Sequence, residues 1–248
     1  MNQWKPKTAV YFDGTDYFTL AAPGAGIANA NPEHDEAWSL SFWLDGRVQG
    51  TGTIFSNSGD SSDPGWQMQI DSSGRLKIKA GHSTTSQTST SLSTSYYTYM
   101  ERGFVNVVFT YDGSGSTSGY TVYSNGHTDS YDNFGSSSIS AMAPNATIQI
   151  GAGTSSGGSV TDKLFYRTVH NVSLWSKELT ATEAHEIYHS QEAPGPNNLL
   201  RHSAASNLVA WWLASHASDS ETTIYDRSSN SNNLTGVGFS ASHIVSIR

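Results

Sequence analysis

The segment HEIYH, residues 185–189, matches the H-E-x-x-H pattern that places two zinc-binding histidines and a catalytic glutamate on one helix of metalloproteases. A catalytic zinc also needs a third protein ligand, which the extended form of the motif supplies as a later histidine. Here Glu192 stands at the glycine position of that extended form, and Gly195 stands at its last histidine. We therefore interpret the segment as a surface helix with His185 and His189 side by side on its flank, and not as a protease site.

Oxygen-bearing side chains could form a calcium site. In the segment DRSSNSN they stand at alternate positions, beginning with Asp226 and including Asn230. Calcium takes about six to eight oxygen ligands, and Asp13 and Asp16 in FDGTDYF could supply further carboxylates. We predict calcium binding by Asp13, Asp16, Asp226 and Asn230. The alternative is that these residues only initiate turns.

Binding of a sugar needs an exposed aromatic ring that stacks on it and polar groups that hold its hydroxyls. Candidates stand after the DPG turn, beside a long Ser/Thr-rich stretch at 80–95, and in a second polar loop at 132–145 or next to it. They are Trp66, Tyr96, Tyr97, Tyr99, Tyr131 and Asn133. The alternative for each is that it packs at the edge of a sheet.

Catalytic patterns are weak in this chain. Glycosidases built on β-sandwiches carry carboxylates at alternate positions of one strand, and no E-x-D-x-E occurs here. Serines are too abundant for one of them to be singled out as a nucleophile. We therefore predict that the protein is not an enzyme.

Composition excludes several classes of partner. Charged residues make up 14% of the chain, against about 25% in an average protein, and the net charge is −8 with no basic run. These values argue against nucleic-acid binding. The chain has no cysteine, no apolar window long enough for a membrane span, and no apolar stretch of signal-peptide length after Lys5 and Lys7. We expect a protein that is not inserted into a membrane and is not exported by a signal peptide.

Short runs of β-branched and aromatic residues alternate with Gly, Asn, Asp and Ser, which predicts an all-β protein. WSLSFWLDG shows the alternation best and predicts a strand with one buried face. The expected strands are residues 9–12, 17–20, 38–44, 53–55, 66–70, 75–79, 104–111, 120–126, 147–151 and 165–175. One short helix is expected near 180–191, where Thr180 and Glu183 form a capping box.

The order AVYFDGTDYFTL, WSLSFWLDG, SSGRLKI, FVNVVFTYDG, YTVYSNG and VHNVSLWSKELTATEAHEIYH resembles a laminin-G-like jelly roll of the concanavalin A-like superfamily. The resemblance covers about residues 8–190. It implies an antiparallel jelly-roll sandwich of two sheets, in which LTATEAHEIYH is the family's short helix. Carbohydrate binding is the usual function that such a fold implies.

Residues 207–236 resemble a segment that usually precedes the FDG strand in such domains, yet here it follows the helix. We predict a jelly-roll core over 1–195, and a C-terminal segment over 196–248 that completes the sandwich or forms subunit contacts. The resemblance implies a bacteriophage protein, because this chain arrangement recurs in jelly-roll proteins of bacteriophage particles.

The expected protein is a non-enzymatic decoration or appendage protein on the virion surface of a bacteriophage, made in the host cytoplasm. Its expected partners are capsid or other virion proteins, copies of itself, and host surface glycans that it binds weakly. The alternative is a free, calcium-dependent, lectin-like carbohydrate-binding module.

Overall fold

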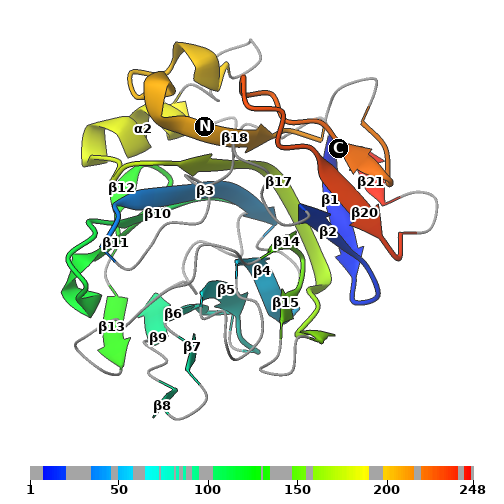
Figure 1. Ribbon diagram of the computed structural model, residues 1–248, viewed down its shortest axis with the longest axis horizontal. Coiled ribbons are helices and arrows are strands. Elements are labelled where there is room, and N and C mark those ends of the chain that lie inside the picture. Colours follow the sequence, from blue (N-terminus) through cyan, green and yellow to red (C-terminus); the bar gives the residue numbers. More distant parts are fainter. Residues whose placement is uncertain are drawn as a thin grey trace.

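Antiparallel strands form most of the described chain and are arranged in two layers (Figure 1). The computed structural model describes residues 8–20, 35–45, 50–57, 65–72, 74–80, 82–83, 86–87, 91–94, 103–129, 131–134, 147–154, 159–189, 198–214, 219–239 and 243–246. Among these residues, no helix is long and apolar enough to cross a membrane.

The larger sheet has eight strands, in the order β12-β11-β10-β3-β17-β1-β21, with β18 paired to β17. Their bounds are β12 His127–Thr128, β11 Tyr120–Ser124, β10 Phe104–Tyr111, β3 Trp38–Asp45, β17 Phe165–Trp175, β1 Thr8–Asp13, β21 Ile244–Ser246 and β18 Leu208–Trp212. All pairings in this sheet are antiparallel.

The second sheet has seven strands, in the order β19-β20-β2-β14-β4-β5-β6. Their bounds are β19 Thr223–Ile224, β20 Leu234–Val237, β2 Tyr17–Leu20, β14 Ile148–Ile150, β4 Gly52–Ser56, β5 Trp66–Ile70 and β6 Leu76–Ala80. Three two-stranded sheets complete the described strands: β7 His82–Ser83 with β8 Ser86–Gln87, β9 Ser91–Thr94 with β13 Tyr131–Phe134, and β15 Gly153–Thr154 with β16 Val160–Thr161. The predicted all-β jelly-roll sandwich of two antiparallel sheets is confirmed.

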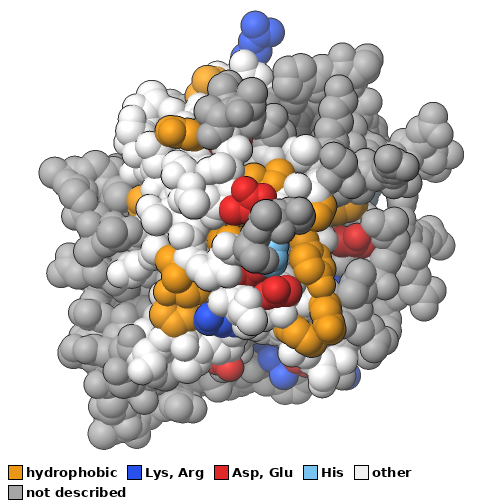
Figure 2. Space-filling model, turned by 90° about the vertical axis from the view of Figure 1, so that its right-hand side faces the viewer, with side chains coloured by type: hydrophobic (Ala, Val, Ile, Leu, Met, Phe, Trp, Pro, Cys, Tyr) orange, Lys and Arg blue, Asp and Glu red, His pale blue; other side chains and the backbone are white. Residues whose placement is uncertain are grey.

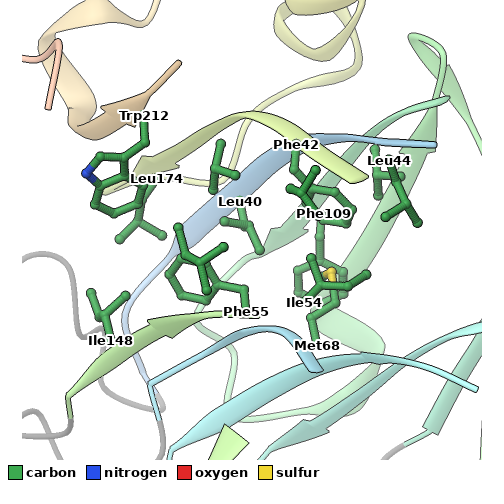
Figure 3. Close-up of a cluster of buried hydrophobic side chains, with 14 of the residues drawn as sticks. Leu40, Phe42, Leu44, Ile54, Phe55, Met68, Phe109, Ile148, Leu174 and Trp212 are labelled. Carbon is green, nitrogen blue, oxygen red and sulfur yellow. The ribbon is translucent and has the colours of Figure 1, made fainter. Parts of the chain in front are cut away.

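The core lies between the two sheets, where their apolar faces meet (Figure 3). From the larger sheet come buried side chains of β3, β10, β17 and β18, and from the smaller sheet those of β4, β5 and β14. Those labelled in Figure 3 are Leu40, Phe42, Leu44, Ile54, Phe55, Met68, Phe109, Ile148, Leu174 and Trp212. Burial of this apolar area is the main force that holds the two sheets together.

The outer face of the larger sheet is also covered. Helix α2 (Ala181–His189) and the short 3-10 helices η3 (Leu199–Arg201) and η4 (Ala205–Asn207) follow β17 in the chain, and a second apolar cluster includes residues of this region and of β10 and β18. As a result β3 is buried at every position. The prediction of one buried face for this strand was wrong, because sequence alternation does not show which distant elements cover the second face.

The C-terminal part of the chain contributes strands to both sheets. β18 pairs with β17 and β21 pairs with β1 in the larger sheet, while β20 pairs with β2 in the smaller one. Figure 1 shows β20 and β21 beside the N-terminal strands β1 and β2, at one end of the sandwich. Segments from the two ends of the chain therefore meet at one place.

Candidate functional site

The turn between β1 and β2 brings two aspartates to that end of the sandwich. The Asp13 carboxylate accepts hydrogen bonds from the Thr15 N–H at 2.8 Å and from the Thr15 hydroxyl at 2.7 Å. Gly14 has a φ of +96°, and a Cβ there would lie 2.5 Å from the ring of Phe165. This tight turn therefore requires glycine. Asp16 follows it, and its side chain is buried.

Asp16 is 0% exposed, and neither of its carboxylate oxygens has a hydrogen-bond partner among the described residues. His243, which precedes β21, brings its Nδ1 to 2.6 Å from Asp16 Oδ2. The same nitrogen lies 3.1 Å from the carbonyl oxygen of Tyr11. We take Tyr11 as the hydrogen-bond acceptor, because Nδ1 carries one hydrogen at most and its approach to Asp16 lacks hydrogen-bond geometry. A buried, charged carboxylate that accepts no hydrogen bond destabilises the fold unless another group, such as a cation, interacts with it.

The two aspartates differ in their readiness to ionise. Burial, and next the charge of Asp13, raises the pKa of Asp16 from 3.8 to about 6. The pKa of Asp13 is lowered, mainly because Thr15 donates hydrogen bonds to its charged form. At neutral pH both are deprotonated, and Asp16 carries its charge at a cost that a bound cation would offset.

Asp13, Asp16 and His243 each place a ligand atom within 4.8 Å of the others. Carboxylates are ligands that calcium prefers, and an imidazole beside them extends the range to transition metals. The buried oxygens of Asp16, which accept no hydrogen bond from any described residue, fit a cation at this point. The side chains present therefore suit a divalent cation, and Asp13 and Asp16 are the residues that would hold calcium.

Two exposed aromatic rings lie directly beside this cluster. Phe165 and Tyr166 are 42% and 47% exposed, and their ring centres are 3.8 Å apart. Phe165 is paired with Asp13 across the β1–β17 ladder. Tyr166 has a φ of +51°, which is uncommon for a non-glycine residue and often marks functional positions. The two rings offer an apolar surface next to the carboxylates.

Lys163 adds a cation to the same end of the molecule. Its ammonium donates to the carbonyl oxygen of Thr15 at 2.6 Å and lies 5.3 Å from the ring centre of Tyr17. Figure 2 shows acidic side chains and a histidine near the centre of this face, with hydrophobic side chains on both sides. We call Asp13, Asp16, Lys163, Phe165, Tyr166 and His243 the turn site.

Trp66 was predicted to be an exposed platform for a sugar, and this prediction was wrong. It is 0% exposed, and its ring stacks on Trp38 at 4.0 Å and on Phe55 at 5.0 Å. The DPG turn before it suggested a loop position, but Trp66 is the first residue of β5 and points into the core.

The other predicted glycan contacts are not tested. Tyr96, Tyr97 and Tyr99 lie outside the described residues. Tyr131 and Asn133 lie in β13, paired with β9, and their side chains are also outside what the structure describes. These contacts stay predictions.

Asp226 and Asn230 do not join Asp13 and Asp16 in the group of converging ligands. The Asp226 carboxylate accepts hydrogen bonds from the backbone N–H groups of Trp211, Ser228 and Asn232, at 2.9, 2.8 and 2.9 Å. The Asn230 amide donates to the carbonyl oxygens of Leu208 and Val209. The alternative interpretation fits these two residues, since both stabilise a turn against β18.

The H-E-x-x-H segment lies on α2, as expected, but its glutamate is engaged elsewhere. Glu186 accepts hydrogen bonds from the backbone N–H and the hydroxyl of Ser203. A metalloprotease glutamate must instead face the zinc-bound water. The helix thus serves to cover the sheet.

The serine-hydrolase pattern G-x-S-x-G was expected to be absent, and this expectation was wrong, because it occurs as GTSSG at 153–157. In hydrolases the serine of this pattern lies between a strand and a helix. Here the pattern begins in β15, which pairs antiparallel with β16. The strand-turn-helix context of a nucleophile is therefore missing in the described part of this region.

Sequence reasoning missed four members of the turn site. Phe165 and Tyr166 begin the run FYRTVHNVSLW, and two adjacent aromatics on a strand cannot both face one core, which was a usable signal. Lys163 stands just before them without a distinguishing pattern. His243 gave no local signal either, because only the pairing of β21 with β1 brings it to Asp16.

Comparison with known proteins places the fold in a family. A family model described as the concanavalin A-like lectin/glucanases superfamily, Laminin_G_3, matches residues 12–185. Comparison with curated protein sequences found no match.

Several solved structures share the fold. A proposed carbohydrate-binding protein from Bacteroides ovatus aligns with 98% of this chain at a TM-score of 0.56 and 17% identity, and this chain spans 60% of it. A heptameric SAP-like pentraxin from Limulus polyphemus aligns at a TM-score of 0.51 and 17% identity, covering 95% of this chain and 96% of its own. The Ruminococcus gnavus sialidase module CBM40, bound to α2,3-sialyllactose, aligns at a TM-score of 0.52 and 13% identity, covering 74% of this chain and 97% of its own. Identities this low show a common fold alone, whereas the family model covers more than half of the chain. The chain therefore belongs to the concanavalin A-like lectin/glucanase superfamily, in its Laminin_G_3 family.

Proposed function

We propose that the chain is a non-catalytic glycan-binding module that holds its ligand at the turn site. The observation that carries the proposal is the pair of exposed rings, Phe165 and Tyr166, directly beside the carboxylate of Asp13. Aromatic faces pack against the apolar C–H face of a sugar, and carboxylates accept hydrogen bonds from its hydroxyls. The turn site combines both at one exposed place.

A divalent cation, calcium first, is part of this proposal. Asp16 supplies two buried oxygens that have no hydrogen-bond partner in the part of the chain that the structure describes, and Asp13 supplies a partly exposed carboxylate. A cation there would be held by the protein on one side and would leave positions for ligand oxygens on the other. Such a site would order the turn and attract hydroxyl or carboxylate groups of a glycan.

Neighbouring structures support the proposal by analogy only. The Bacteroides ovatus protein is described as a proposed carbohydrate-binding protein, and the Ruminococcus gnavus module was solved with sialyllactose. These two descriptions make a glycan the first class of ligand to test.

A glycan array, probed with fluorescently labelled protein in calcium and again in chelator, tests the proposal. We expect binding to a restricted set of glycans in calcium, with loss of signal in Tyr166→Ala and weakening in chelator. Leu200→Ala is the matched control. Leu200 is also an exposed apolar residue, with 52% of its surface accessible, but it lies in η3 and is not part of the turn site. Equal signals for Tyr166→Ala and the wild type would place binding elsewhere, and a blank array would contradict the function.

A virion setting is a second proposal, about where such a module works. It is supported by the charge-poor surface, rich in Ser, Thr, Gly and Asn, in a chain without cysteine. As a decoration or appendage protein of a phage particle, the chain would assemble with copies of itself or with capsid proteins while it binds host glycans. Light scattering coupled to size-exclusion chromatography tests the assembly: we expect a defined oligomer, and a strict monomer at high concentration would contradict it.

A further inference from the structure

Three histidines from two elements meet on the helix side of the larger sheet. His185 and His189 are four residues apart on α2, and their ring centres are 3.9 Å apart. His127, in β12, lies with its ring centre 5.8 Å from that of His185. All three side chains are exposed. None belongs to the turn site.

The backbone holds this juxtaposition in place. Asn125 and Gly126, with φ values of 50° and 76°, form the two-residue turn between β11 and β12, as expected for an Asn-Gly hairpin. A Cβ on Gly126 would lie 3.1 Å from His185 Nδ1 and from Tyr188 Cβ. The hairpin therefore packs directly against the helix, which fixes the distance between His127 and the helical pair.

We propose that His127, His185 and His189 bind a first-row transition-metal dication such as Zn²⁺, Ni²⁺ or Cu²⁺. Imidazole nitrogens are preferred ligands of these ions and poor ligands of calcium. Histidines four residues apart on a helix face are a known chelating pair. The third ligand comes from the hairpin, and water completes the coordination shell.

The ligand atoms need only small movements to converge. Nitrogens bound to one ion at about 2.0–2.1 Å lie no more than about 4.2 Å apart. In the present conformation the three histidines do not form a group with all ligand atoms within 4.8 Å, so the rings must turn to close the site. Exposed side chains change rotamer within nanoseconds, so this adjustment is readily made.

The site is a structural clamp and not a protease centre. Its glutamate, Glu186, accepts hydrogen bonds from the backbone N–H and the hydroxyl of Ser203 and is therefore engaged elsewhere. The bound ion would instead join α2 to the β11–β12 hairpin. Any ion that binds the folded state alone raises its stability.

Isothermal titration of the tag-free full chain with Zn²⁺ tests the site, with Cu²⁺ electron paramagnetic resonance to identify the ligand atoms. We expect one Zn²⁺ site on the helix, a rise in melting temperature, and a Cu²⁺ spectrum with nitrogen ligands. We expect Zn²⁺ affinity to fall by at least about tenfold in each of the variants His185→Gln, His189→Gln and His127→Gln. Loss of a residue that only hydrogen-bonds to a metal ligand already lowers metal affinity by about 10- to 100-fold, and loss of a ligand itself should cost at least as much.

Glu186→Gln is the matched control on the same helix, and Asp16→Asn is the control for the turn site. Neither should change Zn²⁺ affinity at the three histidines. Because Asp13, Asp16 and His243 could also take a transition metal, the helix variants are titrated in the Asp16→Asn background. Zn²⁺ binding that survives His185→Gln and His189→Gln in this background, or the loss of all Zn²⁺ binding in Asp16→Asn alone, would overturn the proposal. Unchanged affinity in His127→Gln would also overturn it, because the site would then be only a helical pair.

Discussion

Asp16 carries an energetic cost that a neighbouring residue or ligand must offset. Its carboxyl is buried and has no hydrogen-bond partner among the residues that the structure describes, and its pKa is raised from 3.8 to about 6. The folded protein then holds a proton on Asp16 that the unfolded chain has already lost, so stability falls as pH rises from about 4 to 6. A pKa change of this size corresponds to about 3 kcal/mol.

Asp16→Asn should therefore stabilise the metal-free protein at pH 7 by up to about 3 kcal/mol and have little effect at pH 4. Urea unfolding of both proteins in chelator at the two pH values measures this. Buried His170 has a pKa lowered to about 3, so its effect on the free energy of unfolding has the opposite sign: the protein loses stability as pH falls below the usual pKa of histidine. That effect is common to both proteins and cancels in the comparison. A stability difference that is equal at both pH values would contradict the account.

Individual residues of the site were only partly predictable. Asp13 and Asp16 stood out because two carboxylates flank one glycine turn, which is a local pattern. Asp226 stood out by another local pattern, oxygen-bearing side chains at alternate positions, yet it stabilises a turn, because its oxygens accept hydrogen bonds from backbone N–H groups that only the folded chain presents. His243 reaches Asp16 through strand pairing between the two ends of the chain, which no local pattern records.

Among the elements, α2 shows how a local signal specifies a boundary. Thr180 Oγ1 accepts a hydrogen bond from the Glu183 N–H at 3.3 Å, and Glu183 Oε2 accepts one from the Thr180 N–H at 2.8 Å. This is the capping box that the sequence predicted, and the helix begins at Ala181 directly after it. Lys177 adds an ion pair to Glu183 at 2.7 Å.

Loss of this cap should be measurable. Thr180→Ala leaves an N–H of the first turn without its partner, so we expect the free energy of unfolding to fall by about 1 kcal/mol. Thr182→Ala, an exposed position inside the helix, should be neutral or slightly stabilising. Urea unfolding of the two variants provides the comparison, and equal effects would argue against a role for the cap.

Strands were predicted well where alternation and turn residues agree, as in β3, β10 and β17. The burial of their side chains was predicted less well, since β3 is buried on both faces and Trp66 of β5 lies in the core. Both errors have one physical cause. A strand's own sequence shows its period, whereas the helices or strands that cover it come from distant parts of the chain.

At the scale of the whole molecule, the sandwich depends on its C-terminal strands. β18 and β21 add to the larger sheet and β20 to the smaller one. Val209, Ile224 and Leu234 from this segment are buried in the main core. Full burial of three such side chains contributes about 5–9 kcal/mol, against a total stability of about 5–15 kcal/mol for a typical domain.

A chain that ends at residue 195 should therefore fail to fold, although the family match ends at residue 185. We expect it to be insoluble or to lack a cooperative melting transition in circular dichroism. A truncated chain that melts cooperatively near the full-length temperature would contradict this view and make the C-terminal segment a separable addition.

The central claim is that a glycan binds at the turn site through Phe165 and Tyr166. The most direct test is isothermal titration of an oligosaccharide identified on the array, with wild type, Tyr166→Ala and Leu200→Ala compared in calcium. Burial of one aromatic ring contributes about 1.5–3 kcal/mol, so Tyr166→Ala should weaken binding by about 10- to 150-fold while Leu200→Ala binds as the wild type does. Equal affinity of Tyr166→Ala and wild type would contradict the claim.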